Sequence, residues 1–475
     1  MSPRESGKAL DETAMIRLFH VYFPVRTVLL VLSDTVFIVT GLLTTTLVWS
    51  YVRGNPDPLS GYAKVALVSF VLAMCLYYYD LYESEIAANW REVTTRLVQV
   101  LGTACIVLAL LYYAYPEMQL GRGTLITGIL LTGAGLVVCR RLFLVLNGSP
   151  SLTDRTLFLG HGALAIALAE ELSKRPELGV RAIGYAGEEP ENPAASNGLR
   201  RLGDLIQLDE LAQRNHIDRI IVAMPDRRGR LPLELLLELK KRGVRVEDGT
   251  RLYEEVTGRV SLDSLRLSSL VFSSESHPSK ATLLCKRLVS IVGSALALAI
   301  LSPLMASIAL LIWIDSPGQV IFQQKRVGKD GHLFTLFKFR SMWVNADSDG
   351  IPKPAEQDDK RMTRVGHWLR RTRLDEIPQL YNVLRGDIDF VGPRPFVPEQ
   401  EEELAATIPF YRHRWAVRPG ATGWAQVHRG YCATVEDNIE KLSYDLFYIQ
   451  NISVGLDLLI LFQTMKILIL RRGAR

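Results

Sequence analysis

Four long apolar stretches in the first third of the chain constrain its fold more than any other feature. They cover residues 27–49, 63–81, 97–115 and 124–146. Each is close to the roughly 20 residues that a helix needs to cross about 30 Å of hydrocarbon. The first is too long for a cleavable signal and has no small-residue cleavage site. Residues 1–150 are therefore predicted to form a four-helix transmembrane bundle, in which Asp34 faces the interior or snorkels to the surface.

Basic residues around these stretches predict their orientation. They gather before the first stretch, between the second and third, and after the fourth, at Lys8, Arg17, Arg26, Arg91, Arg96, Arg140 and Arg141. The other two loops carry fewer Lys and Arg. Loops rich in Lys and Arg remain on the cytosolic side. The N-terminus, the middle loop and everything after Leu146 are therefore expected in the cytosol.

The composition agrees with membrane segments joined to soluble domains. The chain has 475 residues, of which 48% are hydrophobic and 22% are charged. Its net charge of +5 suits contact with anionic lipid headgroups or phosphates, does not require nucleic acid, and no nucleic-acid partner is expected. The five cysteines include no CxxC pair, so neither a zinc site nor a disulfide framework is predicted.

Residues 151–262 show the alternation of an α/β domain. A short apolar strand at 155–159 precedes Gly160-His161-Gly162-Ala163-Leu164-Ala165, a G-x-G-x-x-A turn that leads into a helix. Strands are predicted at 180–185, 219–223 and 244–246, with helices at 205–214 and 233–241. This spacing predicts a small, parallel, Rossmann-like sheet.

The glycine turn leaves two roles open for this domain. A turn of this kind can hold phosphates at a helix N-terminus. However, Glu188 and Glu189 lie beyond Gly187 in a loop, so no clear acid ends the second strand. Glycines also serve tight turning and packing of a helix on a sheet. The domain could bind a nucleotide, or it could be a regulatory or assembly module.

A fifth apolar stretch differs from the first four in its flanks. Residues 288–314 are uncharged and contain Ser302-Pro303, where a kink is expected because proline lacks a backbone donor. Lys286 and Arg287 precede the stretch, and Lys325, Arg326 and Lys329 follow it. Both ends should prefer the cytosolic leaflet, which predicts a re-entrant helix at 283–314. The alternative is a kinked helix that spans the membrane. A linker is placed at 263–279 and a catalytic domain at 280–475.

Three polar blocks in this last domain carry the candidate chemistry. They are Lys338-Phe339-Arg340-Ser341-Met342, residues 370–395 and residues 418–427. Within the second, Asp375 and Glu376 stand side by side among arginines, and nearby cations are expected to lower the pKa of such carboxyl groups. An ionised carboxylate can coordinate Mg²⁺ or attack phosphorus. Alternatively, the pair is a solvated helix start before Pro378, because acids are favoured in a first turn.

The blocks read KFR-x-M, R-x-x-x-LDE-x-PQL-x-NVL-x-GD, VGPRP and RPG-x-TGWAQV. Together they resemble the bacterial monotopic phosphoglycosyl transferases over about residues 280–475. The four preceding helices and the Rossmann-like domain are similar to the long form of that family, which includes undecaprenyl-phosphate glucose phosphotransferases. The resemblance implies a mostly α-helical catalytic domain and a re-entrant helix broken at Ser302 and Pro303.

The resemblance also implies roles for individual residues. Asp375 would attack the β-phosphorus of a UDP-sugar and release UMP, and Glu376 would help to hold Mg²⁺. Lys338 and Arg370 would lie near the phosphates. The remaining residues at substrate-binding positions are Arg340, Pro393, Arg394, Pro395, Gln426 and Arg429.

The implied reaction passes a sugar phosphate, from UDP-glucose or another UDP-hexose, to undecaprenyl phosphate. It would be the first membrane step of exopolysaccharide synthesis, on the cytoplasmic face of the bacterial inner membrane and in contact with its lipids. The N-terminal helices and the middle domain could support a homodimer. Many members of the family continue AQV-NGR, whereas this chain continues with His428-Arg429-Gly430-Tyr431, so its arginine is shifted by one position.

The sequence leaves open the place of its C-terminal stretch and two alternative functions for the whole protein. Residues 454–470 could lie in the membrane interface, with Phe447 and Tyr448 either helping to anchor them or packing in a core. A second hypothesis is a nucleotide-sugar oxidoreductase or epimerase that uses Gly160–Ala165. A third is a non-enzymatic membrane scaffold for polysaccharide assembly.

Overall fold

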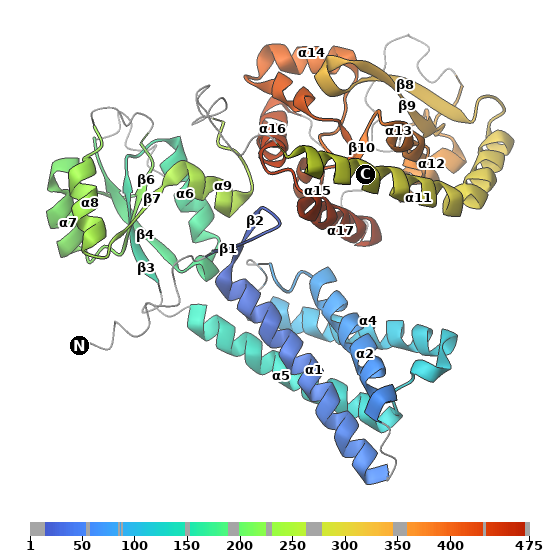
Figure 1. Cartoon of the computed structure of the whole chain (residues 1–475), viewed down its shortest axis with the longest axis horizontal. Helices are drawn as coiled ribbons and strands as arrows, with labels where there is room; N and C mark the ends of the chain where they lie inside the picture. Colours follow the sequence, from blue (N-terminus) through green and yellow to red (C-terminus); the bar gives the residue numbers. More distant parts are fainter. Residues whose placement is uncertain are drawn as a thin grey trace. The chain divides into compact units, whose positions relative to one another are not determined.

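The computed structural model describes residues 15–53, 58–83, 86, 89–147, 153–188, 199–224, 230–262, 278–344, 359–430 and 434–470. The chain divides into two compact units (Figure 1). The first comprises Met1–Leu18 and Tyr22–Thr257, and the second comprises Phe19–Val21 and Gly258–Arg475.

The four apolar stretches near the N-terminus form four long helices, as predicted. They are α1 (Val25–Arg53), α2 (Pro58–Tyr78), α4 (Trp90–Ala114) and α5 (Arg122–Asn147), with the short turn η2 (Pro116–Met118) between the last two. Their length and apolar composition suggest membrane spans. They share a core that includes Leu42, Leu72 and Leu136. A small hairpin of β1 (Met15–Leu18) and β2 (Val21–Pro24) precedes them and was not predicted.

Asp34 lies inside this group of helices and is paired. Its Oδ2 is 2.6 Å from Nη2 of Arg140, and both side chains are only 1% exposed. Arg140 also donates to the carbonyl of Leu81 through Nη1. Because a lone charge in lipid is costly, this pairing explains how α1 accommodates an acid. Of the two positions expected for Asp34, the structure supports the interior one.

The middle domain is the predicted parallel sheet with helices. In chain order its elements are β3 (Asp154–Leu159), α6 (Ala163–Ser173), η4 (Pro176–Leu178), β4 (Val180–Ala186), β5 (Arg201–Gly203), η6 (Leu205–Gln207), α7 (Leu208–Arg214), β6 (Arg219–Val222), α8 (Leu233–Lys241), β7 (Arg245–Asp248) and α9 (Gly249–Thr257). The strand order is β5-β4-β3-β6-β7, the order of a doubly wound half-sheet. The edge strand β5 was missed because its three residues show no apolar pattern.

Gly160 in the glycine turn is required by the backbone itself. Its φ is 92°, and a Cβ there would lie 3.0 Å from Cγ of Met224. Gly162 then forms the N-cap of α6 without a side-chain cap. The backbone conformation and the contact with Met224 are therefore sufficient reasons for Gly160, and nucleotide binding stays a prediction.

The second unit is mostly helical, as expected, with two small sheets. Its elements are α11 (Lys280–Asp315), β8 (Ile321–Val327), η7 (Lys329–Gly331), β9 (Leu333–Phe339), α12 (Arg364–Thr372), η8 (Leu374–Glu376), α13 (Gln379–Arg385), β10 (Asp389–Val391), α14 (Pro398–Thr407), η9 (Tyr411–Ala416), β11 (Gly420–Thr422), α15 (Trp424–His428), α16 (Val435–Gln450) and α17 (Val454–Leu470). Strands β8 and β9 form an antiparallel hairpin, and β10 pairs with β11 in parallel.

The apolar stretch at 288–314 belongs to α11, which contains Pro303 without a break in the helix. Figure 1 shows the ribbon of α11 changing direction along its course. Pro303 cannot donate to the carbonyl of Ala299, and the hydroxyl of Ser302 donates to that oxygen instead, at 2.8 Å. The change of direction agrees with a kink in α11, and the helix is assigned as continuous from Lys280 to Asp315, so re-entry at Ser302 and Pro303 stays a prediction. Exposed side chains such as Leu296 and Ile300 suggest contact with lipid.

Two basic residues at the start of α11 fix it to the rest of the second unit. Lys286 Nζ donates to the carbonyl of Val391 at 2.7 Å and pairs with Asp457 at 2.9 Å. Arg287 donates to the last carbonyls of α13, at Val383 and Leu384. Lys286 is therefore buried within the protein instead of facing lipid headgroups, although the sequence suggested only a flanking role for it.

The C-terminal helices show whether Phe447 and Tyr448 anchor the chain in the membrane or pack in a core. Phe447 and Tyr448 are 3% and 1% exposed and belong to the core of the second unit. The prediction that these two residues pack in a core is confirmed. The interpretation as membrane anchors is wrong, because they lie on the buried side of α16. Helix α17 buries Leu456, Asp457 and Ile460 and exposes apolar residues elsewhere.

Arg414 is a buried hub of this unit that the sequence did not reveal. Its Nε lies 2.9 Å from Asp445, and its Nη1 lies 3.2 Å from Glu401. It also donates to the hydroxyl of Tyr411 and, at 2.8 Å, to the carbonyl of Arg394. One guanidinium thus joins α14, η9, α16 and the chain after β10.

Replacement of Arg414 by methionine is expected to lower the free energy of unfolding by about 3–5 kcal/mol. The substitution removes a 4% exposed cation and leaves two buried carboxylates without it. Urea unfolding of the purified protein measures the change. Arg412→Met is the control, because Arg412 is exposed and, among the residues that the structure describes, contacts only the ring of Trp415. Equal effects of the two substitutions would contradict the assignment of Arg414 as a hub.

Candidate active site

A short turn presents the two adjacent carboxylates. Helix α12 ends at Thr372, and the next residue, Arg373, has φ of 55°, which turns the chain into η8, where Asp375 and Glu376 lie. Helix α13 then begins after Pro378 and ends at Arg385, and Gly386, with φ of 98°, caps it. Asp375 is only 8% exposed. The interpretation of the pair as a solvated helix start is therefore wrong.

The β8–β9 hairpin brings Lys338 to this turn. Asn382 on α13 accepts from the backbone of Phe337 at 3.0 Å and donates to the carbonyl of Thr335 at 2.7 Å. These two bonds hold β9 beside the helix that follows the carboxylates. As a result, Nζ of Lys338 lies 3.1 Å from Oε1 of Glu376.

Arg394 reaches the same oxygen from another element. Its Nη2 is 3.1 Å from Oε1 of Glu376, so one carboxylate oxygen lies between two cations. Burial alone would raise the pKa of Glu376, but Lys338, Arg394 and Arg373 outweigh it and hold that pKa well below its usual range. Glu376 is thus ionised at neutral pH, as the sequence predicted.

Asp375 behaves differently from its neighbour. Burial and the charge of Glu376 raise its pKa to about 6, although Lys338 and Arg370 act in the opposite direction. The prediction that surrounding cations lower the pKa is wrong for Asp375, because desolvation and the adjacent carboxylate outweigh them. The carboxylate is therefore unusually basic for an aspartate.

UMP release from a UDP-sugar is expected to depend on this pKa. If Asp375 must be ionised to react, kcat/KM for release should fall about tenfold per pH unit below about pH 6. The donor diphosphate does not titrate in this range, whereas the lipid monophosphate does, so the first half-reaction is measured without acceptor. A rate that stays flat down to pH 5 would contradict the raised pKa.

Arg370 and Arg340, the residue before Ser341, have different surroundings. Arg370 donates from Nε to the hydroxyl of Ser341 at 2.9 Å, and its charge acts on Asp375. Arg340 is buried and donates to the carbonyl of Ser316 at the end of α11. Among the described residues, its Nε and Nη1 have no partner. Arg370 therefore belongs to the carboxylate site, whereas the structure gives Arg340 no contact with Asp375 or Glu376.

Arg326 on β8 is a further cation of the site that the sequence reasoning did not single out. It donates to the carbonyl of Pro395 at 3.1 Å and to Gln324 at 2.6 Å. Burial and the nearby charge of Arg394 lower its pKa to about 10, and Glu376 acts in the opposite direction. Arg326 lies outside the three polar blocks. In the sequence it stood out only as one of the basic residues that follow the apolar stretch at 288–314.

The other predicted substrate-binding residues contribute in less direct ways. The carbonyl of Pro393 accepts from Gly420, and that of Pro395 accepts from Arg326, so the two prolines hold the backbone around Arg394. Gln426 donates to the carbonyl of Ala421 at 3.3 Å. No contact of Gln426 with the carboxylates is found among the described residues, and its role in binding stays a prediction.

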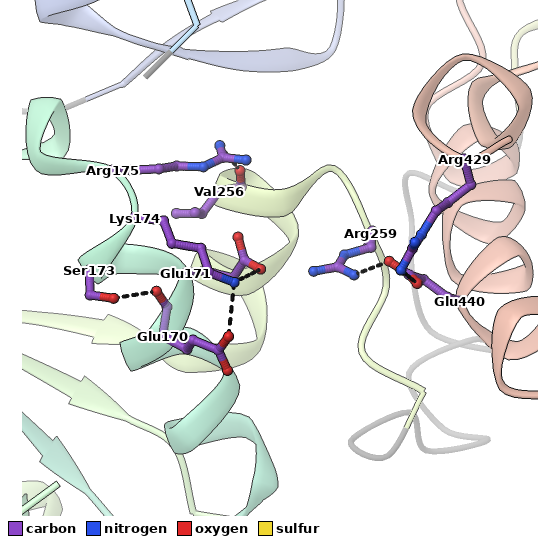
Figure 2. A network of polar contacts seen from close by, with 9 residues as sticks. All are labelled: Glu170, Glu171, Ser173, Lys174, Arg175, Val256, Arg259, Arg429 and Glu440. Atoms are coloured by element: carbon purple, nitrogen blue, oxygen red, sulfur yellow. Dashed lines mark hydrogen bonds and ion pairs between the residues drawn. The ribbon is translucent and has the colours of Figure 1, made fainter. Parts of the chain in front are cut away.

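Arg429 pairs with Glu440 on α16 (Figure 2). The other oxygen of Glu440 lies 2.6 Å from Arg259. The shifted arginine is therefore held in an ion-pair network outside the carboxylate site. Its predicted contact with a substrate remains untested.

Comparison with known proteins places this site in a family. The bacterial sugar transferase family matches residues 281–471, and a CoA-binding domain matches residues 78–247. The UDP-glucose:undecaprenyl-phosphate glucose-1-phosphate transferase of Escherichia coli (strain K12) is 35% identical over 340 residues, which cover 70% of this chain and 72% of that protein. The chain belongs to the bacterial sugar transferase family. As a member of this sugar-phosphate transferase family, it is an enzyme.

Two further relatives differ in how much of this sugar transferase they match. The undecaprenyl-phosphate glucose phosphotransferase of Komagataeibacter xylinus is 29% identical over 474 residues, covering 96% of this chain and 86% of that protein. A UDP-N-acetylgalactosamine-undecaprenyl-phosphate N-acetylgalactosaminephosphotransferase of Aeromonas hydrophila is 42% identical over 228 residues. That match spans 47% of this chain and about half, 52%, of the relative.

The oxygen donors of this sugar transferase suit Mg²⁺. This ion binds through one or two carboxylates together with substrate phosphates and waters. Within the described parts of the chain, both ion pairs of Glu376 use Oε1 and none uses Oε2, and Asp375 is the preceding residue. The described residues contain no cluster of three or more His, Cys, Asp or Glu that could enclose a metal by themselves. The residues therefore fit a metal that is shared with the substrate's phosphates.

Proposed function

We propose that this sugar transferase passes a sugar 1-phosphate from a UDP-hexose to undecaprenyl phosphate through a covalent intermediate on Asp375. A carboxylate oxygen of Asp375 attacks the phosphorus attached to the sugar. The bond from that phosphorus to the bridging oxygen breaks, and UMP leaves with the electron pair. A phosphate oxygen of the lipid then attacks the same phosphorus, and Asp375 departs as a carboxylate. Mg²⁺, when bound, would neutralise phosphate charge beside Glu376.

The environment of Asp375 carries this proposal. It is a buried aspartate with a pKa of about 6, and among the described residues no side chain donates a hydrogen bond to it. Such a carboxylate is ionised at neutral pH and yet poorly stabilised, which favours attack. Lys338, Arg370 and Arg394 lie around it and its neighbour, where they would hold the oxygens of a diphosphate.

The site lies on the same compact unit as α11, which supports a location at the membrane surface. A water-soluble donor and a lipid acceptor must meet there. We propose that α11 enters and leaves the bilayer on the cytoplasmic face of the bacterial inner membrane, with its bend at Ser302 and Pro303. The product would begin exopolysaccharide synthesis, and a homodimer remains part of the proposal.

Purified enzyme incubated with UDP-hexoses and undecaprenyl phosphate tests the reaction. The panel contains UDP-glucose, UDP-N-acetylgalactosamine and UDP-galactose, and UMP is measured with and without the lipid. Release of UMP with one of them, together with a sugar phosphate bound to the protein when the lipid is left out, is expected. Absence of UMP with every donor, combined with bound NAD(H), would favour the oxidoreductase hypothesis instead.

A further inference from the structure

The short segment Gly258–Leu262, which follows α9 directly, packs as part of the second unit. Val260 is 1% exposed and lies in the same core as Trp424, Leu442 and Phe447. Its backbone N–H donates to the carbonyl of Ser443 on α16 at 3.1 Å. The segment precedes the residues that match the sugar transferase family, so nothing in that match assigns it a role.

Gly258 contacts the tryptophan of the third polar block. The indole N–H of Trp424 donates to its carbonyl at 2.9 Å. Gly258 has φ of 64°, and a Cβ there would lie 3.1 Å from Cζ2 of Trp424. Both the conformation and the space therefore require glycine. The position of Gly258 thus limits where the indole ring can lie.

Arg259, the residue after Gly258, adds an ion pair with Glu440. Its guanidinium and that of Arg429 bind opposite oxygens of Glu440 (Figure 2). Arg429 follows α15, the short helix that begins with Trp424, whereas Glu440 lies on α16. The shifted arginine of this chain thus fastens α15 to the carboxylate that also holds the segment.

A continuous set of backbone contacts leads from Trp424 to Arg394. Trp424 follows Gly423, and a Cβ at Gly423 would lie 2.2 Å from the carbonyl oxygen of Gly392. The N–H of Gly392 donates to Thr422 at 2.9 Å, and that of Gly420 donates to Pro393 at 2.9 Å. Backbones in such close contact move together. A displacement of α15 therefore reaches Pro393 and the next residue, Arg394.

We propose that Gly258–Leu262 is a strap that positions Arg394 against Glu376 by fixing Trp424 and the strands β10 and β11. The strap acts through other residues and does not touch the substrate. The inference rests on the proposed function only in that UMP release is its measure. It also assigns Arg429 to the fastening of the strap.

Gly258→Ala in the full-length protein tests the strap, and Gly243→Ala is the matched control. Gly243 also has positive φ, 94°, but a Cβ there meets nothing within 4 Å. Gly258→Ala is expected to lower kcat for UMP release roughly tenfold at a temperature where the protein is folded, because a small misplacement of a phosphate-binding group is costly. The control is expected to keep the kcat of the unmodified protein.

A double-mutant cycle shows whether the effect passes through Arg394. In an Arg394→Lys background, Gly258→Ala should lower kcat by less than about twofold, because the contact that it disturbs is already altered. A purely structural effect would give the same loss in both backgrounds and would overturn the proposal. Equal kcat for Gly258→Ala and Gly243→Ala would overturn it as well. If the unmodified protein released no UMP, the proposed function would fail instead.

Trp424→Phe covers the case in which Gly258→Ala does not fold. The phenyl ring keeps an aromatic side chain beside Phe447, but it removes the N–H that bonds Gly258 and the part of the indole that lies against Gly258. It should reproduce the loss of kcat and the same dependence on Arg394. An unchanged kcat in this variant would contradict the strap.

Discussion

Asp375→Asn is expected to lower the rate of UMP release by roughly 10⁴-fold, as removal of a covalent nucleophile generally does. The amide is close in size to the carboxylate but cannot form the acyl phosphate. Single-turnover assays with UDP-glucose and the other donors measure the loss. Asp330→Asn, at an exposed turn residue, is the control and should retain full activity.

The same substitution is expected to stabilise the fold. The pKa of Asp375 is about 6 in the folded protein and 3.8 ordinarily, so stability falls as pH rises between these values and the penalty is complete above pH 6. A neutral asparagine removes this penalty, by about 1–3 kcal/mol at pH 7.5. Thermal unfolding should therefore show a higher Tm. Full activity, or a lower Tm without activity, would remove Asp375 from its proposed role.

Removal of divalent metal by EDTA is expected to reduce UMP release by roughly 10³-fold, because a metal supplies several kcal/mol of charge stabilisation in phosphoryl transfer. Excess Mg²⁺ should restore the rate. The Tm should hardly change, since Lys338 and Arg394 already balance Glu376 without metal. Turnover that survives EDTA would contradict the metal requirement and show that the cationic side chains alone stabilise the phosphate charge.

Local patterns were enough to predict many of the elements. Four apolar runs became four helices, and the alternation after Arg155 became the parallel sheet, because each signal lies within a few turns of chain. The first two polar blocks likewise supplied Lys338, Arg370 and Arg394, which lie around the two carboxylates. These cations lie on β9, on α12 and shortly after β10.

Contacts between distant residues could not be predicted in this way. Trp424 and Gly258 bond across 166 positions, and Arg414 meets Asp445 across 31. The hydrophobic periodicity that predicts helices and strands does not indicate which distant residue a glycine or an arginine will contact. The raised pKa of Asp375 was missed for a similar reason, since burial depends on tertiary packing and the local sequence showed only cations.

The anchoring of α11 by Lys286 has a consequence for the environment in which the enzyme works. Its ammonium holds the carbonyl of Val391, which directly precedes the glycine and proline before Arg394. For a helix that enters and leaves the bilayer on one face, as proposed, a thicker or thinner leaflet would change the depth and angle at which α11 lies. That movement would pull on β10 through Lys286, so catalytic rate should vary with the acyl-chain length of the surrounding phospholipids.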